Sequence, residues 1–224
     1  MKMKKEAKIS ICLAVILLTA FAFWTAAICL VDVKAVGPEG SAVGFATLNK
    51  LFHGLTGVHM DLYHVTDWLS LIPLGFILGF AILGLTQWIR RKQLLKVDHS
   101  ILALGGFYIV VMAAYIIFEQ FVINYRPVLI NGILEASYPS STTMLVMCVI
   151  PTAIMQLQER IRNVICKRLV TFTLIAFTAF MVIGRLVSGV HWLTDIIGGA
   201  LLSSGLVMMY YATLKTLCDT YKVV

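Results

Sequence analysis

Long uncharged stretches alternate with short polar ones along the whole chain. Most of these stretches approach or exceed the roughly 20 residues that a helix needs to cross the hydrocarbon core of a bilayer. Uncharged runs of this length are helical, because only helices and closed barrels satisfy their backbone polar groups in lipid. The pattern therefore predicts transmembrane helices at about 9–31, 68–89, 100–124, 140–158, 169–187 and 191–214.

Composition supports the membrane class. Of the 224 residues, 60% are hydrophobic and 13% are charged, whereas roughly a quarter of a soluble domain is charged. We expect one all-α domain over residues 1–224, a bundle of six transmembrane helices. The first run exceeds the roughly 7–15 residues of a signal-peptide core, so we expect it to remain as an anchor.

Lysine and arginine residues predict the orientation of this bundle. With the N-terminus inside, only Lys34, Lys50, Arg126 and Arg185 lie in outer segments. Positively charged loops stay on the cytoplasmic side, so we expect both termini to be cytoplasmic in a plasma membrane, with a bacterial one as the working assumption. The net charge of +7 then needs no nucleic-acid partner. The inner segments contain Lys2, Lys4, Lys5, Lys8, Arg90, Arg91, Lys92, Lys96, Arg160, Arg162, Lys167, Arg168, Lys215 and Lys222.

Residues 32–67 are expected to form an outer loop, which is long for a helix bundle. Within it, Leu48, Leu51, Phe52 and Leu55 recur with the spacing of a helix face. This spacing predicts a short amphipathic helix in the outer headgroup layer. Two interpretations of the segment stay open: a loop packed over the bundle, and a lid or lateral gate for a lipid substrate.

Candidate chemistry is confined to three polar segments, which the six-helix topology brings to the same outer face. Ionisable residues near membrane spans are costly, so each is a functional candidate. The segments are Glu119-x6-Arg126-Pro127 after the third helix, Pro139-Ser140-Ser141-Thr142 before the fourth, and Arg185-x5-His191-x3-Asp195 between the fifth and sixth.

The residue types in these segments suit the binding of a phosphate. His191 and Asp195 are four apart and share a helix face, so Asp195 can accept one imidazole proton and leave the other nitrogen as a nucleophile or base. Arg126 and Arg185 offer guanidinium groups that match phosphate geometry. Ser140 is a plausible N-cap, and free amides at a helix start bind anions. A structural alternative also exists, such as Arg126 reaching for lipid headgroups.

Together, the three segments resemble the motifs of the type-2 phosphatidic acid phosphatase superfamily: Lys-x6-Arg-Pro, Pro-Ser-Gly-His and Ser-Arg-x5-His-x3-Asp. The resemblance implies a lipid phosphate substrate and a phosphohistidine mechanism with no metal and no other cofactor. In that mechanism His191 would attack phosphorus and Asp195 would orient the imidazole. The phosphoryl oxygens would be held by Arg126, Arg185, Ser140 and Ser141.

Three positions depart from the family pattern. Glu119 stands in place of a phosphate-binding lysine, Thr142 in place of the second histidine, and Gly184 in place of a serine. Threonine cannot act as the general acid, a role that contributes roughly 10²–10⁴-fold. A lipid diphosphate would tolerate this loss best, because a phosphorylated leaving group departs more readily than an alcohol.

Nearby polar residues offer several ways to compensate. Glu119 is expected to pair with Arg126 or Arg185, and the alternatives are contact with a cationic headgroup or with a bridging cation. A histidine or carboxylate of the outer loop could fold over the site as a substitute acid, and a metal site there is a less favoured alternative. The residues concerned are His59, Asp61 and His64.

Two functions follow from these observations. The first is a phosphatase acting at the outer leaflet on a lipid phosphate or diphosphate, with undecaprenyl diphosphate and phosphatidate-type lipids as candidates. The second is a non-catalytic protein that binds or transports lipid phosphates through the same pocket. The vanadate-using haloperoxidase branch of the superfamily is disfavoured, because this chain is membrane-embedded and lacks the second histidine. The sequence does not indicate an oligomeric state.

Overall fold

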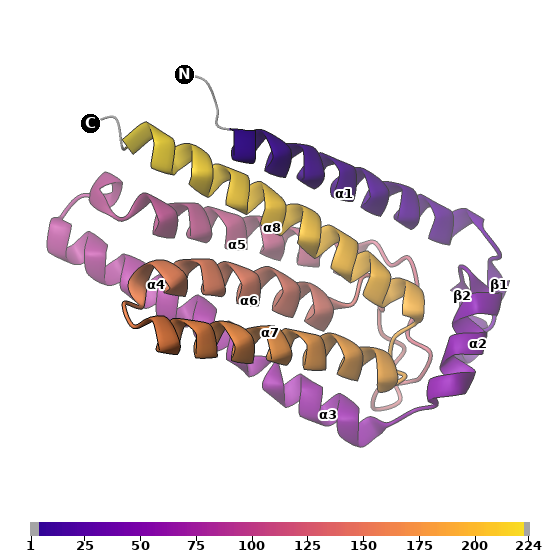
Figure 1. Ribbon diagram of the computed structural model, residues 1–224. Coiled ribbons are helices and arrows are strands. Elements are labelled where there is room, and N and C mark those ends of the chain that lie inside the picture. Colours follow the sequence, from indigo (N-terminus) through magenta and orange to yellow (C-terminus); the bar gives the residue numbers. More distant parts are fainter. Residues whose placement is uncertain (1–4, 222–224) are drawn as a thin grey trace.

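The computed structural model describes residues 5–221, which form a bundle of long helices lying side by side (Figure 1). Among these residues, six helical spans are long and apolar enough to cross a membrane, which confirms the predicted all-α membrane bundle. Lys2, Lys4 and Lys222 lie outside the described residues. The spans are α1 (Lys5–Leu30), α3 with α4 (Met60–Leu69 and Leu71–Arg91), α5 (His99–Gln120), α6 (Ser141–Arg160), α7 (Val164–Val187) and α8 (Leu193–Tyr221).

The second and third spans differ from their predicted bounds. The second begins at Met60 instead of near residue 68, because Ser70 keeps helical backbone angles (φ −65°, ψ −13°) and joins α3 to α4. Because the polar residues of α3 interrupt the apolar pattern, the sequence did not predict this part of the span. The third span ends at Gln120 instead of near residue 124, because Phe121 leaves the helical region (φ −103°, ψ 80°).

The other spans follow their predictions with shifted ends. The fifth begins earlier than predicted, at Val164, where the Asn163 side chain accepts hydrogen bonds from the amides of Ile165 and Cys166. Such an N-cap satisfies backbone donors that a helix start leaves free. The sixth begins at Leu193 and continues beyond residue 214 to Tyr221. A short turn, η2 (Leu94–Lys96), connects α4 to α5.

The segment between α1 and α3 is structured and covers one end of the bundle (Figure 1). Strands β1 (Lys34–Ala35) and β2 (Ala42–Val43) pair antiparallel around the turn η1 (Pro38–Gly40). The predicted amphipathic helix is confirmed as α2 (Ala46–Thr56), which carries buried Asn49. The Asn49 side chain donates to Thr194 Oγ1 at 3.0 Å, so α2 is tied to the start of α8.

Helices α6 and α8 form the centre of the bundle. About half of the membrane-spanning window of each is buried inside the protein, at 56% and 50% respectively. The other spans bury 11–22% of theirs. The polar segments lie next to α6 and α8 along the chain, so their functional side chains are attached to the most buried helices of the fold.

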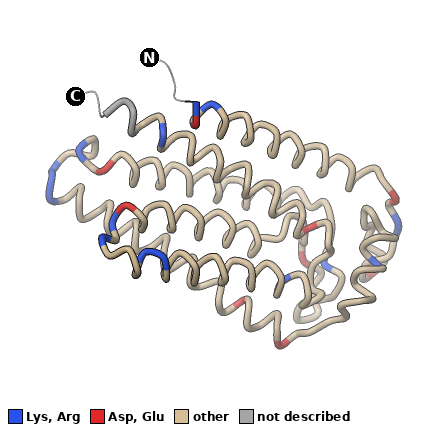
Figure 2. Tube along the Cα trace, in the orientation of Figure 1, with Lys and Arg blue, Asp and Glu red and all other residues tan. Residues whose placement is uncertain are grey.

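Basic residues gather at the end of the bundle that holds both chain termini (Figure 2). The opposite end, where α2 lies, carries few lysines and arginines and several acidic residues (Figure 2). The charge asymmetry read from the sequence is therefore an asymmetry of the folded protein as well.

Candidate active site

The three polar segments meet at the end of the bundle opposite the termini. Arg126 lies in the irregular connection after α5, and Arg185 lies in the last turn of α7. His191 precedes α8, and Asp195 lies in its first turn. Ser140 caps α6, with its side chain accepting from the Thr143 amide at 3.4 Å. All five side chains are at least nine-tenths buried.

A serine that the sequence analysis did not single out connects the histidine to the aspartate. His191 Nδ1 and Asp195 Oδ2 are 3.9 Å apart, which is too long for the direct hydrogen bond that the four-residue spacing predicted. Ser137 Oγ donates to Asp195 Oδ2 at 2.5 Å and lies 3.0 Å from His191 Nδ1. Because the hydroxyl has given its one hydrogen to Asp195, it accepts from Nδ1–H. This arrangement leaves His191 Nε2 with a free lone pair.

The carboxylate of Asp195 is fully engaged by neutral donors. Besides Ser137, the Trp192 amide donates to Oδ2 at 2.9 Å and Asn124 Nδ2 donates to Oδ1 at 3.2 Å. A buried carboxylate is tolerated only when such bonds replace its water. The position of Asp195, and through Ser137 the orientation of the His191 ring, is therefore fixed before any ligand arrives.

His191 Nε2 is buried and has no hydrogen-bond partner. Burial lowers the pKa of His191 well below its ordinary value of 6.5, and the positive charges of Arg126 and Arg185 lower it further. The imidazole is consequently neutral at physiological pH, with its free lone pair on Nε2. This is the state that a nitrogen nucleophile requires.

Each arginine contacts polar protein partners through only part of its guanidinium group. Arg185 Nη2 donates to Asp67 Oδ1 at 2.9 Å and to Thr142 Oγ1. Arg126 Nε lies 3.1 Å from Glu135 Oε2, without the angle of a hydrogen bond. The Tyr63 ring contacts both guanidinium groups, with its centroid 4.8 Å from Arg185 Cζ and 5.8 Å from Arg126 Cζ. These cation–π contacts help to hold two like charges near each other.

Several nitrogen donors of these arginines are buried and make no hydrogen bond. They are Nε and Nη1 of Arg126 and Nε and Nη1 of Arg185. An unsatisfied buried donor costs about 1–3 kcal/mol, and more when it is charged. These donors lie together beside His191, so an anion with several oxygens would satisfy them and remove this free-energy cost.

Two cavities meet at Arg126. A polar cavity of about 260 Å³ is lined by Glu119, Arg126, Ser141 and His191, among others. A largely apolar cavity of about 400 Å³ lies between α4, α5 and α6, and Arg185 and Arg126 are part of its lining. Since both cavities include Arg126 and Ser141, together they suit an amphiphile with an anionic head and an apolar tail.

The predicted ion pair of Glu119 is wrong. Within residues 5–221, the carboxylates near the arginines are Glu135 and Asp67, and no ion pair involves Glu119. The prediction placed Glu119 and Arg126 on one helix face, but the helix ends at Gln120 and the chain then turns away. Glu119 instead lines the polar cavity as an exposed carboxylate.

The other departures from the family pattern have structural roles. Thr142 accepts a hydrogen bond from Arg185, so it helps to position the guanidinium. Gly184 makes room for α3, because a Cβ at this position would lie 2.8 Å from Thr66 Cγ2. This close approach of α3 is what carries Tyr63 and Asp67 to the arginines.

The polar residues proposed as substitutes lie elsewhere. His59 Nε2 is 2.8 Å from the carbonyl oxygen of Thr56, and the His64 ring lies tilted against the Tyr63 ring, with the centroids 5.2 Å apart. Neither these histidines nor Asp61 line the two cavities. Among the described residues, no group of three or more His, Cys, Asp and Glu side chains is arranged to hold a metal ion.

Sequence reasoning missed five residues that build the site: Tyr63, Asp67, Asn124, Glu135 and Ser137. Tyr63 and Asp67 are four apart and precede an apolar run, a spacing that could have extended the helix prediction. Ser137 stands three residues before Ser140 in the second segment. Asn124 and Glu135 carry no signal of this kind, because the connection between α5 and α6 has no periodicity.

Comparison with known proteins places the fold. A family model described as the PAP2 superfamily matches residues 98–217, more than half of the chain. No significant match was found among curated proteins. The chain is similar to the crystal structure of the first transmembrane PAP2 type phosphatidylglycerolphosphate phosphatase from Bacillus subtilis, with 18% identity and a TM-score of 0.58. The match covers 92% of this chain and 96% of that one, and at this identity it shows a shared fold.

Proposed function

The chain belongs to the PAP2 superfamily, and from this premise we propose that it is a membrane phosphatase that hydrolyses a lipid phosphate or diphosphate through a phosphohistidine intermediate. One observation carries the proposal: the free, buried Nε2 of His191 shares a cavity with Arg126, and Arg185 lines the adjoining cavity, with buried donors on both arginines that make no hydrogen bond. A nucleophile and an anion cradle are the two parts that phosphoryl transfer needs.

The first chemical step forms a bond between His191 Nε2 and phosphorus as the bond from phosphorus to the leaving oxygen breaks. The phosphorylated imidazole becomes a cation that keeps its Nδ1–H. Ser137 Oγ accepts a hydrogen bond from this Nδ1–H and donates one to the Asp195 carboxylate, so the negative charge of Asp195 stabilises the imidazole cation through the serine hydroxyl. Water then attacks phosphorus, the N–P bond breaks, Nε2 regains its lone pair, and the water proton leaves with solvent.

The arginines supply the electrostatic part of catalysis. Charge spreads over the oxygens of the phosphoryl group in the transition state, and fixed donors stabilise it there without reorganising. Arg126 and Arg185 are already desolvated and held by Glu135, Asp67 and Tyr63. The free amides at the start of α6, where Ser140 is the cap, add further donors beside Ser141.

The missing second histidine indicates which substrate is favoured. Thr142 cannot donate a proton near neutral pH, so an alkoxide leaving group would receive no help from that position. A lipid diphosphate releases a lipid monophosphate, which leaves as a weakly basic anion. Diphosphates are therefore the preferred substrates in this proposal.

The distribution of charge supports a position for the site at the outer face of the membrane. Basic residues collect at the end that carries the termini, and this end remains cytoplasmic by the positive-inside rule (Figure 2). In this proposal the active site lies at the outer face of the plasma membrane, with a bacterial membrane as the working assumption, and the substrate comes from the outer leaflet.

The test is phosphate release by detergent-purified protein from a panel of lipid monophosphates and diphosphates. We expect turnover that His191→Ala abolishes and that His59→Ala, which changes an exposed histidine outside the cavities, leaves intact. Quenching the reaction under alkaline denaturing conditions should retain an acid-labile phosphate on the wild-type protein and none on His191→Ala. Turnover that survives His191→Ala would overturn the mechanism.

A second candidate function is recognition of lipid phosphates without hydrolysis. It is favoured by the exposed Glu119 carboxylate in the polar cavity and by Thr142 at the general-acid position. In that case every lipid in the panel would remain intact, while labelled lipid phosphate would still bind and Arg185→Gln would release it.

A further inference from the structure

The connection between α5 and α6 forms a short antiparallel ladder beside the site. The Arg126 amide donates to the carbonyl oxygen of Glu135 at 3.0 Å, and the Ser137 amide donates to the carbonyl oxygen of Asn124 at 2.9 Å. The pair of residues between these two bonds forms an antiparallel bridge. Side chains alternate between the two faces of such a ladder, so the four residues named here share one face.

Three of these four side chains have been given a role in the site. Asn124 and Ser137 donate to the carboxylate of the histidine–aspartate pair, and Arg126 lines the polar cavity together with His191. Glu135 is the fourth side chain. Its Oε2 lies 3.1 Å from Arg126 Nε, and it lines the same cavity. The ladder therefore presents a carboxylate to the space that the phosphoryl group would occupy.

The second half of the proposed reaction needs a proton acceptor. Water that attacks phosphorus has to lose a proton, and a positioned base contributes roughly 10²–10⁴-fold to such a step. Thr142 cannot accept this proton near neutral pH. His191 Nε2 is bonded to phosphorus when the water attacks, and the Asp195 carboxylate already accepts from three donors. Another side chain of the cavity must therefore serve as the base.

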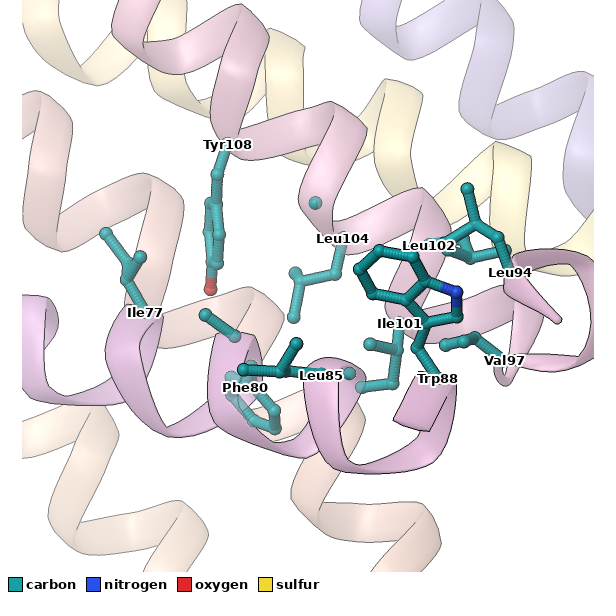
Figure 3. A pocket seen from close by; sticks show the side chains of 13 residues that line it. Ile77, Phe80, Leu85, Trp88, Leu94, Val97, Ile101, Leu102, Leu104 and Tyr108 are labelled. Carbon is teal, nitrogen blue, oxygen red and sulfur yellow. The ribbon is translucent and has the colours of Figure 1, made fainter. Parts of the chain in front are cut away.

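The cavities of the bundle differ as places for this water. A cavity of about 430 Å³ between α4 and α5 is lined almost entirely by apolar side chains such as Leu104 and Trp88 (Figure 3). The hydroxyl in its lining, on Tyr108, lies 3.3 Å from a threonine hydroxyl of α6. The polar cavity instead has the carboxylates of Glu119 and Glu135 in its lining. The choice of base is therefore between these two residues.

Glu135 is the better placed of the two carboxylates. It precedes Ser137 by two residues on the same face of the ladder, and Ser137 Oγ lies 3.0 Å from His191 Nδ1. Glu119 lies in the last turn of α5, before the ladder begins. The Glu135 side chain is also 39% exposed, so a proton that it accepts can pass on to solvent.

We propose that Glu135 is the general base that activates water for hydrolysis of the phosphohistidine. This inference rests on the proposed function and adds a catalytic residue to it. As the water oxygen bonds to phosphorus, one water proton passes to the Glu135 carboxylate. The N–P bond breaks, and its electron pair returns to His191 Nε2. Glu135 then releases the proton to solvent. The first half of the reaction does not use Glu135, because a carboxylate has no proton to give to the leaving oxygen.

Glu135→Gln tests this assignment, because it keeps the size of the side chain and removes the proton acceptor. The substrate is farnesyl diphosphate radiolabelled at its terminal phosphate, and rapid quenching under alkaline conditions follows the phosphohistidine. We expect the variant to form phosphohistidine within about threefold of the wild-type rate and to lose it roughly 10²-fold or more slowly. Phosphohistidine should therefore accumulate during turnover. Both kcat and KM should fall, with kcat/KM within about threefold of wild type, because kcat/KM reports the steps up to loss of the leaving group.

Two further variants make the experiment specific. Glu119→Gln removes the other carboxylate of the cavity, and Glu159→Gln removes an exposed carboxylate at the far end of α6. Neither should trap phosphohistidine. If Glu135 only positioned Arg126, Glu135→Gln would slow the formation of phosphohistidine and lower kcat/KM without accumulation, and this result would overturn the proposal. Trapping by Glu119→Gln and not by Glu135→Gln would overturn it as well. Absence of phosphohistidine from the wild-type protein and every variant would instead overturn the proposed function, and this inference with it.

Discussion

The central spans and the peripheral spans of this bundle differ in a way that explains where the chemistry lies. Helices α6 and α8 are the least apolar of the six spans, and they bury about half of their membrane windows. The α3–α4 span and α5 are more apolar and bury 11% and 22% of theirs. Polar side chains are costly against lipid, so the spans that carry them pack inside.

Particular contacts show the difference. On α6, Gln156 Nε2 donates to Tyr210 Oη of α8 at 2.7 Å, and Ser203 Oγ of α8 donates to the carbonyl oxygen of Met144 at 3.3 Å. On the periphery, Leu78 and Ile109 are 61% and 72% exposed toward the surroundings of the bundle. The centre is thus a hydrogen-bonded frame that fixes the site, and the periphery is a surface for hydrocarbon.

The largest expected effect compares one isoleucine from each region. Ile150 of α6 is fully buried, and Ile109 of α5 is largely exposed. Ile150→Ala should lower the free energy of unfolding by about 2–5 kcal/mol, because it leaves a cavity. Ile109→Ala should change it by less than about 0.5 kcal/mol. Reversible unfolding in mixed micelles measures both, and equal losses would remove the distinction between centre and periphery.

The next prediction concerns Arg185 of α7, whose guanidinium group donates to Thr142 of the central helix α6. Arg185→Gln should reduce kcat/KM for phosphate release by about 10²–10³-fold, because a preorganised donor to the transition state is lost. Arg162→Gln is the control, since this exposed arginine lies in the connection between α6 and α7. A reduction of less than about threefold would mean that Arg185 supports the fold and not the phosphate.

A smaller effect is expected from the link between histidine and aspartate. Hydrogen bonds to charged groups contribute about 1.5–3 kcal/mol, so Ser137→Ala should lower kcat by roughly 10–100-fold with little change in KM. Ser137→Thr keeps the hydroxyl and should recover most of the activity. Ser10→Ala removes a buried serine near the other end of the bundle as a control. A change in KM alone would assign Ser137 to substrate binding.

The last prediction is that the protonation state of His191 does not change over the pH range in which a free histidine titrates. Burial and the two arginines lower the pKa of His191 well below 6.5, so protonation begins only at a pH below that value. The ring should remain neutral as the pH falls from 8 through 6.5. Nitrogen NMR of the imidazole in the ligand-free protein follows this directly, with His191→Gln identifying the signal. A midpoint near 6.5 would show that water reaches the site and that the centre is less enclosed than it looks.

The membrane spans and the motifs could be predicted from the sequence more fully than the connections between the helices. The uncharged runs predicted all six spans, because the hydrocarbon core imposes both length and apolarity. The topology alone brought Arg126, Arg185 and His191 to one end. The contact between His191 and Asp195 was predicted as direct, and the intervening Ser137 was missed, because a single serine in an irregular connection has no pattern to identify it. The partner of Glu119 was predicted wrongly because nothing in the local sequence marks the helix end at Gln120.

The unbroken helix from Met60 to Arg91 has a consequence for the depth at which the protein acts. Its 32 residues rise about 48 Å, whereas the hydrocarbon core measures about 30 Å. Arg90 and Arg91 anchor one end in a headgroup layer, so the excess length emerges at the other end, where Tyr63 and Asp67 are located. The arginines that these residues hold are then level with the headgroups. In the proposed function, a lipid phosphate would meet them at the depth of its own headgroup, and its charge would stay outside the hydrocarbon.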